Sequence, residues 1–398
     1  MSRPVAGVRL GVAQAGIKHV DRDDLVLVEL AQGSACVGLF TQNAFRAAPV
    51  QVAQQHLEDT AGKTRYWLIN TGNANAGTGL EGYKTAELTC AAVAEMQGCH
   101  ANEVLPFSTG VIGELLAGEP IVNALPNICA DLAEDHWQRA SEAILTTDTQ
   151  AKLASRVISV SGSDVTLTGM AKGAGMIRPD MATMLAFVAT DAEVSPAGLD
   201  GLFRQAVSAS FNRITVDGDT STNDAAMLVA TGRSGIAIEA AGSEALLAFT
   251  EALESLCLEL AQAIIRDGEG ATKFVEVKVE GGIDADECDA VAYTIAHSPL
   301  VKTALFASDP NWGRLLAAIG RAGLKNLCVD DVSLYLNDVL IAVNGARAPD
   351  YTEAKGQAAM AAPELTICVD LNRGVASSCV WTTDFSYDYV RINAEYRT

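Results

Sequence analysis

Residues 157–188 read VISVSGSDVTLTGMAKGAGMIRPDMATMLAFV, and this stretch combines a hairpin signal with an irregular approach to a strand. Val157 to Thr168 holds two runs of β-favouring residues around Gly162-Ser163, a pattern typical of a β-hairpin. A Gly-rich turn over 172–175 and a Pro-broken segment then run into the apolar stretch Met184 to Val188, which we expect to form a buried strand. The stretch therefore predicts antiparallel sheet with irregular backbone directly before one of its strands.

The rest of the chain mixes helical and strand periodicity. Helical spacing of apolar residues predicts a helix over 84–98, with Leu88, Ala92 and Met96 on its apolar face, and a longer helix over 243–266. Alternating apolar and polar residues predict strands in three further places: 275–280, 332–341 as a hairpin, and 365–371.

Hairpin signals are frequent in this sequence, and there is no regular βαβ repeat with a phosphate loop. We therefore expect the α+β class: a layered α/β sandwich of antiparallel sheets covered by helices, plus a smaller C-terminal α/β domain that begins near 270–275.

Composition and charge narrow the classes of protein and partner. The chain has 398 residues, enough for two or three compact units, and no apolar run reaches the roughly 18–20 residues that cross a bilayer. Residues 1–16 lack the long apolar region of a secretory signal. The net charge of −21 argues against a nucleic-acid partner, because phosphate binding needs a basic footprint. We expect a cytoplasmic protein with no membrane span.

Cysteines and histidines show no pattern of a metal or triad site. None of the nine cysteines forms a C-x-x-C pair, and the five histidines have no ligand spacing. A serine or cysteine enzyme of the usual kind would need a histidine in a telling context, and none is present. We therefore expect no metal and no Ser-His-Asp triad.

Thr183 stands at the entrance of the strand expected after the Gly-rich turn. A threonine becomes a strong nucleophile when the chain is cut directly before it, because the freed α-amino group, with a pKa of about 7.7–8.0, lies close to Oγ and serves as general base. Branching at Cβ restricts χ1 and would hold Oγ in place. A threonine in an apolar run is also an ordinary strand residue, so the residues alone leave both interpretations open.

The run KGAGMIRPDMATML, Lys172 to Leu185, resembles the signature of the ornithine acetyltransferase (ArgJ) family, whose members cleave themselves between the Ala and the Thr. The resemblance covers essentially the whole chain through four further blocks in the same order: NTGNANAGTG (70–79), FNRITVDGDTSTND (211–224), SDPNWGR (308–314) and RINAEYRT (391–398). One departure is Asp180, where Asn is expected, and it adds a negative charge close to the scissile bond. The resemblance implies a DmpA/ArgJ-like fold.

The resemblance also implies a reaction. Hydrolysis of the Ala182–Thr183 bond would give an α chain, 1–182, and a β chain, 183–398, that stay associated, with a heterotetramer of two of each expected. Thr183 would then attack the acetyl group of N2-acetyl-L-ornithine, and L-glutamate would take that group from the acetyl-enzyme. No cofactor is expected, although acetyl-CoA is a possible second acetyl donor.

Site residues are carried over from the family by position. Thr109 and Gly110 match its oxyanion hole, for which backbone donors suit a developing negative charge. Substrate binding is implied for six positions: Thr146 (with Thr147 as second choice), Lys172, Thr183, Glu269, Asn393 and Thr398. Lys172 as a cation suits a carboxylate, and Glu269 is expected to meet the ornithine amine.

Two other functions fit parts of the same pattern. A self-cleaving amidase or aminopeptidase with an N-terminal nucleophile would use the same catalytic parts with water in place of glutamate, whereas Lys172 and the tail Asn393 to Thr398 favour the transferase. A non-catalytic binding protein that kept the fold would remain one intact chain.

Overall fold

The computed structural model describes residues 2–178 and 184–396. The chain forms two compact units, one made of residues 1–212 and 219–264 and the other of residues 213–218 and 265–398.

The first unit contains two β-sheets. The first sheet has the order β1-β2-β4-β5, with β1 Val8–Ala13, β2 Leu25–Leu30, β4 Tyr66–Asn73 and β5 Val104–Val111. The second has the order β3-β10-β8-β7-β6, with β3 Ala35–Phe40, β10 Ala225–Ala230, β8 Leu185–Thr190, β7 Ser163–Lys172 and β6 Lys152–Val160. Each sheet is mainly antiparallel but has one parallel pair, β4–β5 in the first and β8–β10 in the second.

The two sheets face each other across a shared apolar core. Ile69 and Phe107 of the first sheet belong to the same buried cluster as Phe187 and Met227 of the second. The ring of Phe187 lies 5.1 Å from that of Phe107 in an edge-to-face arrangement, a favourable geometry for aromatic pairs. Alternate residues of each strand face this core, and the residues between them face the outer helices.

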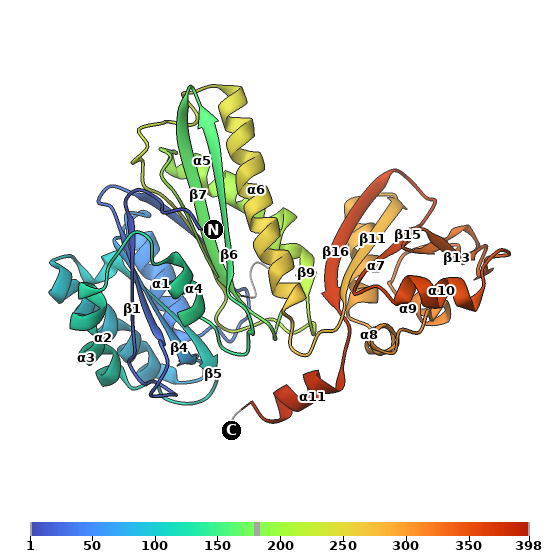
Figure 1. The fold of residues 1–398 in the computed structure, drawn as a ribbon, viewed down its shortest axis with the longest axis horizontal. Helices are drawn as coiled ribbons and strands as arrows, with labels where there is room; N and C mark the ends of the chain where they lie inside the picture. Colours follow the sequence, from blue (N-terminus) through green and yellow to red (C-terminus); the bar gives the residue numbers. More distant parts are fainter. Residues whose placement is uncertain (1, 179–183, 397–398) are drawn as a thin grey trace. The chain divides into compact units, whose positions relative to one another are not determined.

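Helices cover the two outer faces of the sandwich (Figure 1). Val93 and Leu125, from α2 and α3, share a buried cluster with Leu68 of the first sheet. Leu256 of α6 lies against Gly169 of the second sheet. The helices of this unit are α1 Ala48–Asp59, α2 Gly79–Gln97, α3 Gly118–Ala130, α4 Trp137–Ala143, α5 Pro196–Ala209 and α6 Ser243–Arg266. The predicted layered α/β sandwich is confirmed, with mixed sheets in its middle layers.

The second unit is built on a seven-stranded mixed sheet of order β14-β13-β12-β15-β11-β16-β9. Its strands are β9 Ile214–Thr215, β11 Phe274–Gly282, β12 Ser333–Leu336, β13 Val339–Val343, β14 Ala346–Arg347, β15 Glu364–Asp370 and β16 Ala376–Thr383. Its helices are α7 Ala285–Ala296, α8 Pro299–Phe306, α9 Trp312–Gly320, α10 Glu353–Met360 and α11 Tyr387–Ala394. Val277 and Ile367 from the sheet pack with Ile295 of α7 in its core.

The predicted elements with clear periodicity are confirmed. The long helix is α6, the alternating strands are β11 and β15, and the 332–341 hairpin is β12–β13. The hairpin at the start of the quoted stretch is β6–β7, which turns at Ser161-Gly162, one residue earlier than predicted.

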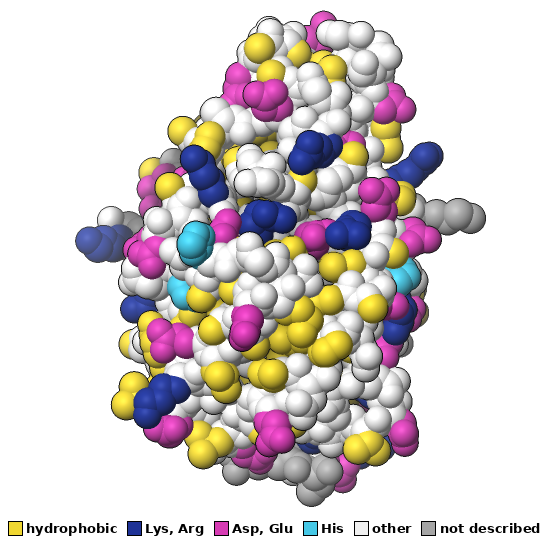
Figure 2. All heavy atoms as spheres, turned by 90° about the vertical axis from the view of Figure 1, so that its left-hand side faces the viewer, with side chains coloured by type: hydrophobic (Ala, Val, Ile, Leu, Met, Phe, Trp, Pro, Cys, Tyr) yellow, Lys and Arg dark blue, Asp and Glu magenta, His cyan; other side chains and the backbone are white. Residues whose placement is uncertain are grey.

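One predicted helix face is wrong. The helix over 84–98 is present as part of α2, but Leu88 and Met96 are 55% and 44% exposed. The buried face instead carries the small residues Ala86, Cys90 and Val93, which let α2 approach its neighbours closely. Figure 2 views the molecule from the side on which α2 and α3 lie in Figure 1, and apolar side chains gather there among charged groups.

Across residues 2–178 and 184–396, no helix combines the length and the apolar character needed to cross a membrane.

Candidate functional site

The predicted cleavage site falls in the connection between two neighbouring strands. Lys172 ends β7 and pairs in antiparallel register with Leu185, which begins β8. Residues 173–184 therefore join two adjacent strand ends. Ala182 and Thr183, within this connection, and Thr398 at the tail lie outside the described residues.

Lys172 is a buried cation that contacts the predicted oxyanion residue. Its ammonium donates a hydrogen bond of 3.2 Å to Oγ1 of Thr109 and lies 3.8 Å from the carboxylate of Asp148. Lys172 and Thr109 are each 9% exposed. The contact joins the end of β7 in the second sheet to β5 in the first, so two residues 63 positions apart in the sequence meet.

Asp148 holds this cation in place. Its fully buried carboxylate also pairs with Lys152 at 2.7 Å and accepts hydrogen bonds from the N–H groups of Gly173 and Thr146. Burial would raise the pKa of this carboxyl, but the charges of Lys172 and Lys152 and the hydrogen bonds outweigh burial and lower the pKa. Asp148 is therefore an anion that compensates the two buried lysines.

The predicted residue Thr146 joins this cluster through its backbone N–H, which lies 3.1 Å from Oδ2 of Asp148. Asp148 was not singled out from the sequence, although it lies in the same TTDT run. A single acid in a polar turn has many ordinary roles, so only its burial reveals this one.

Gly110 occupies a position that only glycine fits. Its φ of +136° is rarely adopted by residues with a side chain, and an added Cβ would lie 2.3 Å from the carbonyl carbon of Gly72 and 2.5 Å from the nitrogen of Asn73. The register of β4 and β5 shifts at this point. A bulge of this kind re-aims backbone groups and often lies next to an active site.

Asn223 connects the predicted oxyanion strand to the rest of the unit. Its side-chain amide donates to the carbonyl oxygens of Ala74 and Ser108, at 2.6 and 2.9 Å. Ser108 directly precedes Thr109, so Asn223 fixes the end of β5 against the loop after β4. Asn223 lies in the block 211–224 that resembles the family, although it was not singled out from the sequence.

Glu269 and Asn393, both predicted binding residues, meet within the second unit. Nδ2 of Asn393 on α11 donates a 2.8 Å hydrogen bond to Oε2 of Glu269, which is 8% exposed. Gly270, with a φ of +66°, lets the loop approach α11, because an added Cβ would lie 2.5 Å from the nitrogen of Tyr389. The structure thus brings the predicted residues together in two groups, one in each unit.

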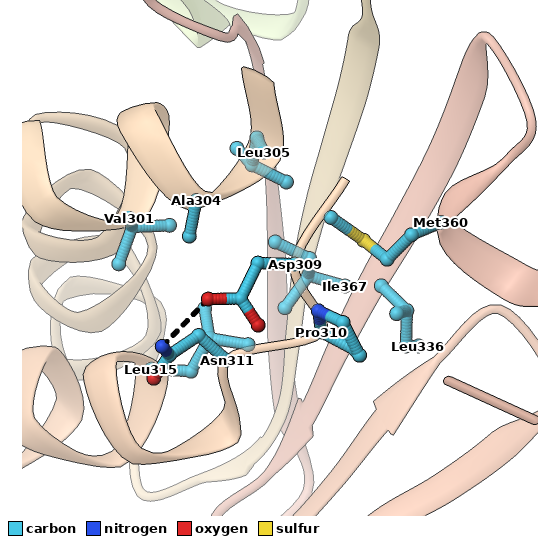
Figure 3. A pocket seen from close by; sticks show the side chains of 10 residues that line it. All are labelled: Val301, Ala304, Leu305, Asp309, Pro310, Asn311, Leu315, Leu336, Met360 and Ile367. Carbon is cyan, nitrogen blue, oxygen red and sulfur yellow. Dashed lines mark hydrogen bonds between the residues drawn. The ribbon is translucent and has the colours of Figure 1, made fainter. Parts of the chain in front are cut away.

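The SDPNWGR block has a structural role in the second unit. Oδ1 of Asn311 accepts a hydrogen bond from the N–H of Arg314 and caps α9, while Nδ2 of Asn311 donates to Asp309 at 2.9 Å. The two side chains lie beside a small cavity lined mainly by apolar residues such as Leu305 and Met360 (Figure 3). The cavity has a volume of about 10 Å³, which is room for about one water molecule.

Comparison with known proteins identifies the family. The chain matches the ArgJ family over residues 9–398. It is 56% identical over 395 residues to the arginine biosynthesis bifunctional protein ArgJ of Methylococcus capsulatus, across 99% of this chain and 96% of that protein. It is 54% identical over 396 residues to the protein of the same name from Pseudomonas fluorescens, across 99% and 97% of the two chains.

Among solved structures, the arginine biosynthesis bifunctional protein ArgJ of Bacillus halodurans aligns with 52% of this chain and 97% of its own, at 37% identity and a TM-score of 0.49. The family match spans nearly every residue, and the two sequence relatives are similar from end to end. This chain belongs to the ArgJ family.

Proposed function

We propose that this protein is an acetyltransferase of arginine biosynthesis that moves the acetyl group of N2-acetyl-L-ornithine to L-glutamate through an acetyl ester on Thr183. The observation that carries the proposal is the ArgJ family match over residues 9–398. The similar proteins of Methylococcus and Pseudomonas are named bifunctional, which supports acetyl-CoA as a second acetyl donor.

The chemistry follows from an N-terminal threonine. Oγ of Thr183 attacks the acetyl carbonyl carbon, and its proton passes to the α-amino group of the same residue. The carbonyl oxygen becomes an oxyanion, the amide C–N bond then breaks, and the leaving amine of ornithine takes the proton from the α-ammonium group. The amine of glutamate attacks the acetyl ester by the reverse sequence and restores the free hydroxyl.

The oxyanion would be received by Thr109 and Gly110. Because Oγ1 of Thr109 accepts a hydrogen bond from Lys172, its own hydroxyl proton is directed away from that ammonium and can be donated to the oxyanion. The bulge at Gly110 turns the backbone at the same place. Lys172, paired in register with Leu185, also supplies a positive charge at the start of β8.

The charges of the predicted binding residues suit an amino-acid substrate. Lys172, with Thr146 in the Asp148 cluster, suits the carboxylate of the amino-acid substrate, and Glu269 suits its amine, while Asn393 and Thr398 match the family's last two binding positions. The carboxylate of Glu269 is held by Asn393 at 2.8 Å, so the acid is oriented before a ligand arrives. An oriented, poorly solvated carboxylate binds an ammonium group more strongly than an exposed one does.

We also propose that self-cleavage at Ala182–Thr183 gives α and β chains that assemble as two of each in the cytoplasm. β8 and β10 come from the β chain, whereas β3, β7 and β6 of the same sheet come from the α chain. Light scattering should then give twice the 41.6 kDa mass of one precursor.

To test the proposal, the purified protein is incubated with N2-acetyl-L-ornithine and L-glutamate, and the products are measured. Ornithine and N-acetylglutamate should form in equal amounts, and Thr183→Ala should abolish both products. Release of acetate at the same rate with and without glutamate would instead identify a hydrolase and refute the transferase. Acetyl-CoA as sole donor tests the second activity separately.

A further inference from the structure

Lys302, on α8 of the second unit, is a buried lysine outside the site described above. It is 1% exposed, and its ammonium donates to Oγ1 of Thr382 at 2.9 Å and to the carbonyl oxygen of Thr383. These partners are neutral. The charges of Asp384 and Asp217 offset only part of the cost of burying the ammonium group, so an apolar side chain would be the stable choice at this position unless the lysine has another role.

The lysine holds the junction between β16 and α11. Its ammonium lies 4.6 Å from the centre of the Phe385 ring, within the range of a cation–π interaction. The backbone N–H of Phe385 also donates to the carbonyl oxygen of Lys302 at 3.2 Å. Lys302 therefore contacts three of the four junction residues 382–385, namely Thr382, Thr383 and Phe385, through its ammonium and its carbonyl group.

From this junction, contacts lead to the predicted amine-binding acid. The ring of Phe385 stacks on that of Tyr389, with 4.7 Å between the ring centres. The carbonyl oxygen of Tyr389 accepts a hydrogen bond from the side-chain amide of Asn393, one turn further along α11. Asn393 in turn donates to Glu269. Asp384, between Thr383 and Phe385, accepts hydrogen bonds from the backbone of the loop that follows Glu269.

We propose that Lys302 is a positioning residue for the amine subsite: it fixes the β16–α11 junction so that Asn393 orients the carboxylate of Glu269 toward the side-chain amine of ornithine. This inference rests on the proposed function, because it assumes that Glu269 receives that amine. Lys302 acts through Phe385, Tyr389 and Asn393 and does not touch the substrate.

The experiment measures the affinity of the cleaved enzyme for L-ornithine and for L-norvaline, which has the same carbon chain without the side-chain amine. Titration calorimetry gives both Kd values. In Lys302→Met the preference for ornithine over norvaline should fall roughly tenfold, the loss expected for one misplaced charge-assisted hydrogen bond. Norvaline affinity should stay unchanged, whereas a general loss of structure would weaken both ligands.

Lys273 provides a matched control. It is also a buried lysine of the second unit, 8% exposed, but its ammonium donates to the carbonyl oxygens of Met360 and Ala362. Lys273→Met should keep the ornithine preference. Phe385→Leu breaks the same chain of contacts at a half-buried position and should reduce the ornithine preference as Lys302→Met does. This variant therefore tests the proposal if Lys302→Met does not fold.

Glu269→Gln separates the two proposals. Loss of the preference in Glu269→Gln, with the wild-type ratio kept in folded Lys302→Met and in Phe385→Leu, would overturn the role of Lys302 alone. An unchanged preference in Glu269→Gln would overturn the amine subsite itself and the inference with it.

Discussion

Asp224 directly precedes β10, and its carboxyl group is buried in an environment that disfavours the ionised form. It is 2% exposed, and Oδ2 has no hydrogen-bond partner among the described residues. Burial raises the pKa of Asp224 well above its usual range, and a hydrogen bond from Ser221 and the charge of Lys172 offset only part of that effect. The group is therefore protonated in the folded protein over a range in which an unfolded chain would be ionised.

The expected consequence is that Asp224→Asn stabilises the protein at neutral pH. When the pKa of a carboxyl group is higher in the folded than in the unfolded protein, its contribution to the free energy of unfolding is complete below the unfolded pKa. This contribution is lost as the pH rises from the unfolded to the folded pKa, at up to about 1.4 kcal/mol per pH unit. The amide does not titrate, so the melting temperature of the variant should exceed that of the wild type at pH 7 and approach it near pH 4. Equal differences at both pH values would contradict a buried neutral Asp224.

Lys302 should produce the opposite dependence. Burial lowers the pKa of Lys302 to about 7, and the charges of Asp384 and Asp217 offset only part of this effect. Between pH 7 and the unfolded pKa of about 10.4, the lysine is protonated in the unfolded chain but largely neutral in the folded protein. The free energy of unfolding of the wild type therefore increases with pH over this range, by up to about 1.4 kcal/mol per pH unit. Lys302→Met should lack this gain. Parallel melting profiles of the two proteins from pH 7 to 10 would contradict it.

At the scale of elements, the paired ends of β4 and β5 place the predicted oxyanion donors. Gly110→Ala should block self-cleavage and transfer together, because the added methyl group meets the backbone of Gly72 and Asn73 and the positive φ becomes strained. A denaturing gel and the acetylornithine assay measure the two effects.

A glycine in open space serves as the control. Gly201 lies inside α5, and nothing lies within 4 Å of its added Cβ, so Gly201→Ala should gain about 0.5–1 kcal/mol and keep full activity. Normal processing of Gly110→Ala would show that the bulge is not needed for the oxyanion.

The elements also show what a sequence can and cannot predict. α6, β11 and β15 follow from apolar periodicity because each buries one regular face. The face of α2 does not, because small residues set its close packing while Leu88 stays in solvent. Contacts such as Lys172 with Thr109, 63 residues apart, leave no local pattern, and the family resemblance alone brought those two residues into one predicted site.

Neither Lys302 nor Asn223 was singled out from the sequence. Lysine in a short amphipathic helix and asparagine in a polar loop are ordinary surface residues in a sequence, and only the three-dimensional packing shows that both are buried. Thr183, the centre of the predicted chemistry, lies outside the described residues, so its role stays a prediction.

For the whole molecule, the order of strands determines what cleavage can do. In the second sheet, β10 and β8 lie side by side between β3 on one edge and β7 and β6 on the other. A cut at Ala182–Thr183 would place the two inner strands on one fragment and the three flanking strands on the other. Each fragment would then supply hydrogen-bond partners and core side chains to its neighbour, and neither would hold the complete second sheet alone.

We therefore expect the active protein to run as two bands, each near half of 41.6 kDa, on a denaturing gel, yet to elute as one species in native buffer. Mass spectrometry should locate the new amino terminus at Thr183. The fragments should separate only under conditions that also abolish the cooperative melting transition, because separation requires opening the second sheet and the core that holds Phe187 and Met227. Active material consisting only of the uncut chain would refute the assignment of Thr183 as the nucleophile. Fragments that separate in native buffer while each stays folded would refute the shared sheet as the cause of their association.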